Sequence, residues 1–159
     1  MTPLLTAELC AGIAAARAAG AASLECSLDL GRSRTRIELD AEGWRWRDVS
    51  YPFPAGCKTR TVYRWDGAAF APVARFGSSL IKLVPTEWGA PTFEIDGVKM
   101  LPSAQLSPYE DARRKVELVA PRGKAVLDTC AGLGYFAAWC LQQGAARVQS
   151  YEKNPDVLW

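Results

Sequence analysis

The segment that decides the fold is VLDTCAGLGYFAA, residues 126–138. It begins with an apolar run typical of a buried strand, passes through a turn that contains Gly132 and Gly134, and continues into a run typical of a helix. Glycines at such a turn let the backbone bend sharply and approach a ligand without a Cβ in the way. The segment therefore predicts the strand, loop and helix of a nucleotide-binding fold.

A second strand follows the predicted helix and ends in an acid. The run ARVQSYE, residues 146–152, is typical of a strand, and Gly144 ends the helix before it. Strand, helix and strand form a βαβ unit, whose parallel strands place a ligand at their carboxyl ends. Glu152 lies 24 residues after Asp128, where a carboxylate can accept hydrogen bonds from both vicinal hydroxyls of a ribose. The unit is predicted to bind a nucleoside.

Two classes of nucleoside cofactor fit this unit. The run GLGYFA matches G-x-G-x-x-A, so a fragment of a dinucleotide-binding oxidoreductase is one interpretation. However, the strand of a dinucleotide fingerprint runs apolar into the first glycine, whereas here Asp128 and then Cys130 precede Gly132. An acid there repels a pyrophosphate and suits the ammonium and sulfonium groups of S-adenosylmethionine. These residues favour S-adenosylmethionine.

The loop and the second strand also resemble a known family. VLDTCAGLGYFA, with YEKNPDVL downstream, looks like the first and second motifs of class I S-adenosylmethionine-dependent methyltransferases. With KLVPTEWGAPTFEIDGVKM and SPYEDARRKVELVAPRG upstream, the chain resembles a narrower group of predicted methyltransferases, mainly archaeal and loosely related to spermidine synthases. The resemblance implies methyl transfer by in-line attack on the sulfonium carbon, in which correct positioning of the nucleophile contributes most of the rate.

The resemblance also implies a set of cofactor-binding residues and leaves the catalytic residues and the methyl acceptor unknown. The set is Asp128, Cys130, Gly132, Gly134, Tyr135 and Glu152. Asp128 is expected near the methionine part, the two glycines beneath the cofactor, and Glu152 at the ribose. Cys130 is interpreted as a small loop residue and not as a nucleophile, because no base is adjacent in the sequence. Tyr135 either caps the cofactor edge or packs its helix.

The expected fold class is α+β. An N-terminal helix and a small antiparallel β module, residues 1–105, precede residues 106–159, the start of a Rossmann-like S-adenosylmethionine-binding domain. The first helix is expected over residues 7–19, with Thr6 as its cap, and hairpin turns are expected at Asp66-Gly67 and Asp96-Gly97. The second part begins with a helix for which Ser107, Pro108 and Glu110 form a capping box.

Only the first βαβ unit of that domain is expected in this sequence. A class I methyltransferase has a much larger sheet, so we expect the chain to be the N-terminal part of a longer protein, inactive alone. Parallel strands that are left uncovered tend to associate with other chains, so the open sheet is a candidate contact between subunits of an oligomer.

An alternative function is a non-catalytic binding module. Alternation within residues 32–49 predicts a hairpin with one apolar face, which carries Trp44 and Trp46, and one arginine-rich face. The arginines are Arg32, Arg34, Arg36, Arg45 and Arg47. They form a candidate surface for RNA or a protein partner. The favoured interpretation is a solvated edge strand whose charge is balanced by neighbouring acids.

Composition excludes several other classes. A chain of 159 residues with 49% hydrophobic and 23% charged residues is globular, and a net charge of +2 gives no general attraction to nucleic acid. No apolar run approaches the ~20 residues of a bilayer helix, so a cytoplasmic protein without membrane contact is expected. Histidine is absent, and the five cysteines are widely spaced without a CxxC pair. We therefore expect reduced thiols and no metal site.

Overall fold

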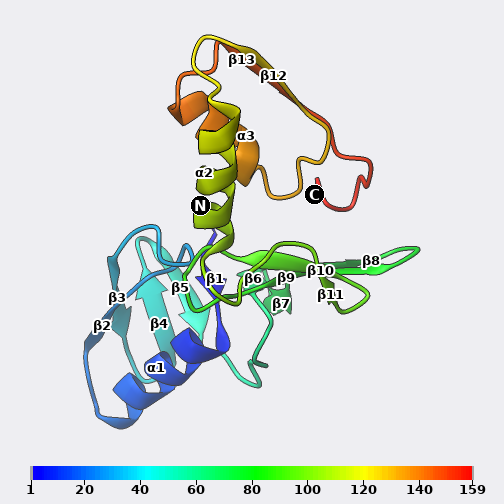
Figure 1. Cartoon of the computed structure of the whole chain (residues 1–159). Coiled ribbons are helices and arrows are strands. Elements are labelled where there is room, and N and C mark those ends of the chain that lie inside the picture. Colours follow the sequence, from blue (N-terminus) through cyan, green and yellow to red (C-terminus); the bar gives the residue numbers. More distant parts are fainter. Residues whose placement is uncertain (1, 159) are drawn as a thin grey trace. The chain divides into compact units, whose positions relative to one another are not determined.

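Short strands and helices make up the part of the chain that the structure describes. The structure is a computed structural model, and it describes residues 2–158 (Figure 1). Its class is α+β, as predicted, with three helices, several small antiparallel sheets and a short parallel pair in the described range. The chain divides into two compact units: residues up to Ala74 with Lys82–Pro85, and Arg75–Ile81 with the residues from Thr86 onward. The division at residues 105 and 106 stays a prediction.

The first unit contains one helix and two sheets. Helix α1 spans Ala7–Ala18, and the Thr6 hydroxyl caps it by accepting a hydrogen bond from the Leu9 N–H at 3.3 Å, as predicted. The larger sheet has the order β2 (Ser23–Cys26), β3 (Thr35–Leu39), β4 (Gly43–Trp46) and β5 (Val49–Pro52). The smaller sheet has the order β1 (Leu4–Leu5), β6 (Tyr63–Trp65) and β7 (Phe70–Pro72). The predicted Asp66-Gly67 turn joins β6 to β7.

An aromatic core stabilises the first unit. Trp44 is fully buried and stacks on Tyr51, with 4.5 Å between the ring centroids. Leu5 on β1 and Ile13 on α1 are also fully buried, so the helix and both sheets contribute to one core. Along β4 the tryptophans are buried while Arg45 is exposed, which confirms the predicted apolar face of this strand.

The cysteines are not all free thiols, and here the sequence-based expectation is wrong. Cys10 on α1 and Cys57 in the loop before β6 form a disulfide, although 47 residues separate them in the sequence. Their spacing gave no sign of the pairing because the tertiary fold, and not a local motif, brings the helix and the loop together. Cys26, Cys130 and Cys140 are free.

A four-stranded sheet precedes the C-terminal part of the chain. Its order is β11 (Val98–Lys99), β10 (Thr92–Ile95), β9 (Leu80–Val84) and β8 (Ala74–Phe76), and the boundary between the two units falls within β8 and β9. The predicted turn at Asp96 and Gly97 joins β10 to β11, and both turn residues have positive φ values, 50° and 84°. A two-residue hairpin of the type I′ class requires this backbone conformation.

The predicted strand, helix and strand form in the second unit. Helix α2 (Pro108–Val119) comes first, and the Ser107 hydroxyl caps it by accepting a hydrogen bond from the Glu110 N–H at 2.9 Å. Strand β12 (Ala125–Asp128) then pairs in parallel with β13 (Arg147–Ser150), and α3 (Tyr135–Gln142) connects them. Within residues 2–158, the parallel sheet consists of these two strands.

Two strand boundaries differ from the expectation. Strand β13 ends at Ser150, because its partner β12 ends opposite at Asp128, so Glu152 lies two residues beyond the strand. Strand β3 begins at Thr35, so Arg32 and Arg34 precede it. None of the helices in the described range is long and apolar enough to cross a bilayer, and the cytoplasmic location stays a prediction.

Candidate functional site

Two carboxylates lie at or just beyond the carboxyl ends of the parallel strands. Asp128 is the last residue of β12, and Glu152 follows β13. Both accept hydrogen bonds from the backbone of the loop between β12 and α3, residues 129–134. We call residues 129–134 the glycine loop. The structure thus brings together the two acids predicted to flank a ligand, at the sheet edge where α/β folds bind ligands.

The Asp128 carboxylate is held by the glycine loop and by β13. The residue is 7% exposed; its Oδ1 accepts a hydrogen bond from the Cys130 N–H at 3.2 Å, and its Oδ2 accepts one from the Ser150 hydroxyl at 3.0 Å. These bonds compensate the cost of burying a charged group. A carboxylate has about four acceptor positions, so each oxygen retains capacity for a cationic ligand.

Glu152 connects the glycine loop to the segment after β13. Its Oε2 accepts a hydrogen bond from the Gly132 N–H at 3.0 Å, and its Oε1 accepts one from the Asn154 N–H at 3.0 Å. The Ala131 N–H donates to the Tyr151 carbonyl at 2.9 Å, which joins the same two segments through their backbones. The half-buried carboxylate retains acceptor positions that vicinal hydroxyls can use.

Both glycines of the loop have backbone conformations that other L residues rarely adopt. The φ values are 52° at Gly132 and 76° at Gly134. A Cβ on Gly132 would lie 3.5 Å from the Phe93 ring, whereas a Cβ on Gly134 would have no atom within 4 Å. The loop is therefore packed on the Gly132 side and open on the Gly134 side, where a ligand can approach the backbone.

Tyr135, the first residue of α3, belongs to an aromatic cluster. Its hydroxyl donates a hydrogen bond to the Pro91 carbonyl at 2.9 Å, and its ring meets the Tyr109 ring edge-on, with 5.6 Å between centroids. Tyr109 also packs on Trp139 of α3, whose indole N–H donates to the Tyr109 carbonyl at 2.9 Å. These contacts support the packing interpretation of Tyr135, and a contact with a cofactor stays a prediction.

The two cysteines near Asp128 lie in different environments. Cys130 is exposed in the glycine loop, whereas Cys140 on α3 is fully buried. Burial raises the pKa of the Cys140 thiol, and the negative charge of Asp128 raises it further. Because the thiolate is the nucleophilic form, this environment keeps Cys140 unreactive.

Sequence reasoning missed three residues that contact the loop or its acids: Ser150, Asn154 and Phe93. Ser150 precedes Glu152 by two positions, and this spacing in a predicted strand would have placed both on one face. Asn154 was expected to cap a helix that begins at Pro155, but residues 155–157 form a turn, and the Asn154 N–H donates to Glu152. Phe93 lies 39 residues before Gly132, and no local pattern connects them.

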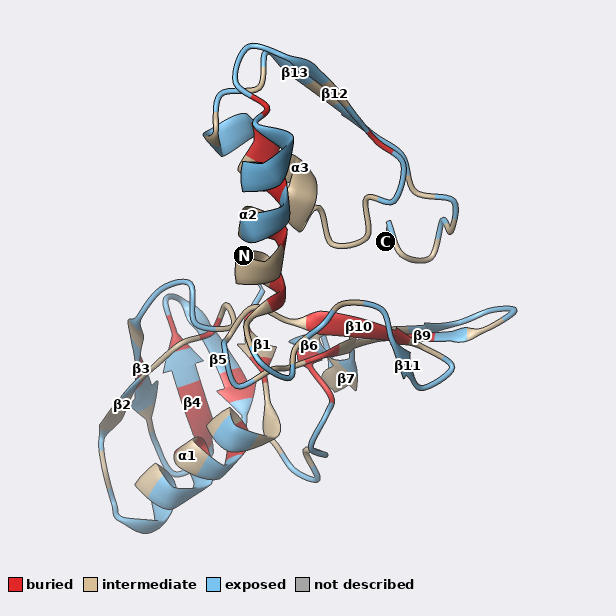
Figure 2. Cartoon of the chain, in the orientation of Figure 1, coloured by how far each residue is buried: buried red, intermediate tan, exposed pale blue. Residues whose placement is uncertain are grey.

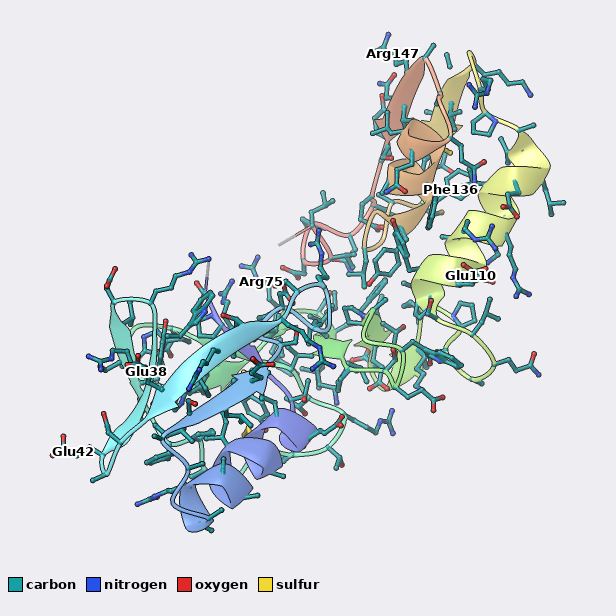
Figure 3. The ribbon with its side chains drawn as sticks, turned by 90° about the vertical axis from the view of Figure 1, so that its left-hand side faces the viewer. Glu38, Glu42, Arg75, Glu110, Phe136 and Arg147 are labelled. Atoms are coloured by element: carbon teal, nitrogen blue, oxygen red, sulfur yellow. A yellow bond between two sulfur atoms is a disulfide. The ribbon has the colours of Figure 1, made fainter. Side chains whose placement is uncertain are left out.

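The predicted arginine surface is spread over several elements. Arg45 on β4 pairs with Glu38 on β3 at 2.8 Å, and Figure 3 labels Glu38 on this sheet. The Arg47 guanidinium lies 4.4 Å from the centroid of the Trp46 ring. Both side chains are exposed, so the pair fits the balanced, solvated charge that the sequence favoured. The expectation of an edge strand is wrong, because β2 and β5 pair along the outer sides of β3 and β4. Binding of RNA or of a protein partner stays a prediction.

The parallel pair is largely uncovered in the described structure. Figure 2 shows β12 and β13 mostly in the colour of exposed residues, and Leu127 on β12 is 64% exposed. An exposed leucine in a parallel strand is unusual, because such strands are normally covered on both faces. Contact of this surface with a second copy stays a prediction.

Comparison with known proteins gives one informative similarity. The chain is 44% identical over 94 residues to the uncharacterised protein MJ1233 of Methanocaldococcus jannaschii, a match that takes in 58% of this chain and 31% of the relative. The chain therefore spans about a third of the length of this curated relative. No family model matches the chain.

Proposed function

We propose that the chain carries one wall of the S-adenosylmethionine site of a class I methyltransferase. One observation supports this most directly: Asp128 and Glu152 follow adjacent parallel strands, and both are hydrogen-bonded to one glycine loop. The resemblance of this segment to the first two motifs of that class points the same way. In this proposal the βαβ unit is the start of a Rossmann-like sheet, and the protein belongs to the mainly archaeal methyltransferase group.

The charge around the loop favours S-adenosylmethionine over a dinucleotide. Two acids contact the glycine loop, and the loop sequence TCAGLG contributes no lysine or arginine. A pyrophosphate would bring further negative charge close to Asp128, whereas the ammonium and sulfonium groups of S-adenosylmethionine are attracted to it. A dinucleotide-binding oxidoreductase is therefore the weaker alternative.

In the proposed reaction, the residues of this chain bind and orient the cofactor. Bound S-adenosylmethionine supplies an electrophilic methyl group. Glu152 accepts hydrogen bonds from the ribose hydroxyls, and Asp128 attracts the cationic methionine part. Gly134 leaves the backbone accessible at the open side of the loop. Fixing the methyl group in place in this way reduces the entropic cost of reaching the transition state.

Calorimetric titration of the full-length protein tests the proposal. We expect binding of S-adenosylmethionine and S-adenosylhomocysteine, and no binding of a nicotinamide dinucleotide. Glu152→Ala should weaken binding about tenfold or more, because a hydrogen bond to a charged group contributes about 1.5–3 kcal/mol. Glu42→Ala, at an exposed position in the first unit, is the control and should bind like the wild type. Absence of binding, or tighter binding of the dinucleotide, would contradict the proposal.

A further inference from the structure

The sheet β11-β10-β9-β8 contacts the glycine loop on its packed side. Phe93 on β10 is 7% exposed, and its ring lies 3.5 Å from the position that a Cβ on Gly132 would take. Just before β10, the Pro91 carbonyl accepts the hydrogen bond from the Tyr135 hydroxyl. The start of β10 therefore lies against both the loop and the first turn of α3.

The same sheet also contacts the segment that carries Glu152. In the middle of β8, the Arg75 Nε lies 3.4 Å from the Asp156 Oδ1, and Figure 3 labels Arg75 near the C-terminal segment. A Cβ on Gly77 would lie 3.2 Å from the Asp156 Oδ2. The Asp156 N–H donates a hydrogen bond to the Asn154 side chain at 3.0 Å. The backbone N–H of Asn154 in turn donates to the Glu152 carboxylate at 3.0 Å. A continuous series of contacts thus leads from Arg75 to Glu152.

We propose that this sheet is a positioning element of the S-adenosylmethionine site. Phe93 holds the glycine loop in its binding conformation, and Arg75 holds the segment that presents Glu152. The inference rests on the proposed function, and it assigns a role at the cofactor site to strands that the sequence placed in an accessory module. A loop that is ordered before its ligand arrives loses less conformational entropy on binding, so such support increases affinity.

Phe93 suits this role because its ring faces Gly132. Gly132 has no side chain with which to pack, and its positive φ excludes most residues that could supply one. The buried Phe93 ring supplies the apolar contact from the neighbouring strand. A smaller side chain at position 93 would leave a space beneath the loop, and the loop would sample more conformations.

Backbone hydrogen exchange and calorimetry on the full-length protein test the role of Phe93. In Phe93→Leu and Phe93→Ala we expect faster amide exchange in residues 129–134 and about tenfold weaker binding of S-adenosylhomocysteine. Phe93→Leu keeps a large apolar side chain, so it remains informative if Phe93→Ala does not fold. The control is Val116→Ala, a truncation at a fully buried position on α2 of the same unit, which should leave loop exchange and affinity unchanged.

A double-mutant cycle tests the second contact. Arg75→Gln and Asp156→Asn should each weaken the binding of S-adenosylhomocysteine severalfold. The double variant should bind no more weakly than either single variant, because both substitutions remove the same Arg75–Asp156 ion pair. Unchanged loop exchange and affinity in a folded Phe93→Leu variant, or additive effects in the cycle, would overturn the inference. If the wild type binds no S-adenosylhomocysteine while Phe93→Leu still accelerates loop exchange, the bracing of the loop is supported and the proposed function is overturned.

Discussion

The Asp128 carboxylate accepts a hydrogen bond from the Ser150 hydroxyl at 3.0 Å, between the final residues of two parallel strands. The bond fixes one oxygen of the carboxylate, and the Cys130 N–H fixes the other. Asp128 is thus held in one orientation before any ligand binds. A negative charge with a fixed position can discriminate between ligands of similar shape and different charge.

Asp128→Asn should weaken the binding of S-adenosylmethionine more than the binding of S-adenosylhomocysteine. The amide keeps the size of the carboxylate, and its NH₂ group can donate to the Ser150 hydroxyl, so the fold should be retained. Only S-adenosylmethionine carries the sulfonium charge, and only its affinity loses that part of the attraction. Calorimetric titration of both ligands measures the difference. Equal losses for the two ligands would show that Asp128 does not contact the sulfonium region.

Gly134→Ala should impair binding more than Gly132→Ala does. Both residues have positive φ, so each substitution should cost about 1–2 kcal/mol of stability. The two differ in surroundings, because a Cβ at Gly134 points into open space, where the ligand is proposed to lie, and a Cβ at Gly132 faces Phe93. Urea denaturation measures the stability of each variant, and titration with S-adenosylhomocysteine measures its affinity. A larger loss of affinity in Gly132→Ala would place the ligand on the other side of the loop.

The features that the sequence predicted well depend on local chemistry. The Ser107 hydroxyl caps α2 through the N–H three residues later, and the Asp96-Gly97 pair needs only its own backbone conformation to form a turn. The order of strand, glycine loop, helix and strand is likewise contained in a few dozen consecutive residues. These features could be predicted because all their partners lie close together in the sequence.

The features that the sequence did not predict join distant segments. Cys10 and Cys57 meet across 47 residues, and Phe93 reaches Gly132 from a strand assigned to a different module. Such contacts depend on how helices and sheets pack against one another. No periodicity in a single sequence predicts this packing. The same reason applies to β13, which ends where its partner strand ends and not at the acid that marked it.

Reduction of the Cys10–Cys57 disulfide should destabilise the protein. A crosslink that closes a loop of this length contributes about 2–4 kcal/mol, mainly by restricting the unfolded chain. Thiol titration of the 159-residue chain in denaturant should find three free thiols without reductant and five with it. Cys57→Ser should lower the unfolding temperature to that of the reduced wild type, whereas Cys130→Ser, at an exposed free thiol, should not change it. Five reactive thiols in the unreduced protein would contradict the pairing.

The stability of α2 should depend on pH through Glu110. The hydrogen bond from Arg113 lowers the pKa of this carboxyl from 4.5 to about 2, with a further contribution from the positive charge of Arg113. Because the folded-state pKa lies below the ordinary value, the stabilisation is complete above pH 4.5 and is lost as the pH falls toward 2. The difference in unfolding free energy between the wild type and Glu110→Gln should therefore shrink over this range. Urea denaturation at several pH values measures it, and the comparison cancels the titration of other carboxyl groups. A difference that stays constant from pH 7 to pH 2 would show that the Arg113 pair does not stabilise the folded chain.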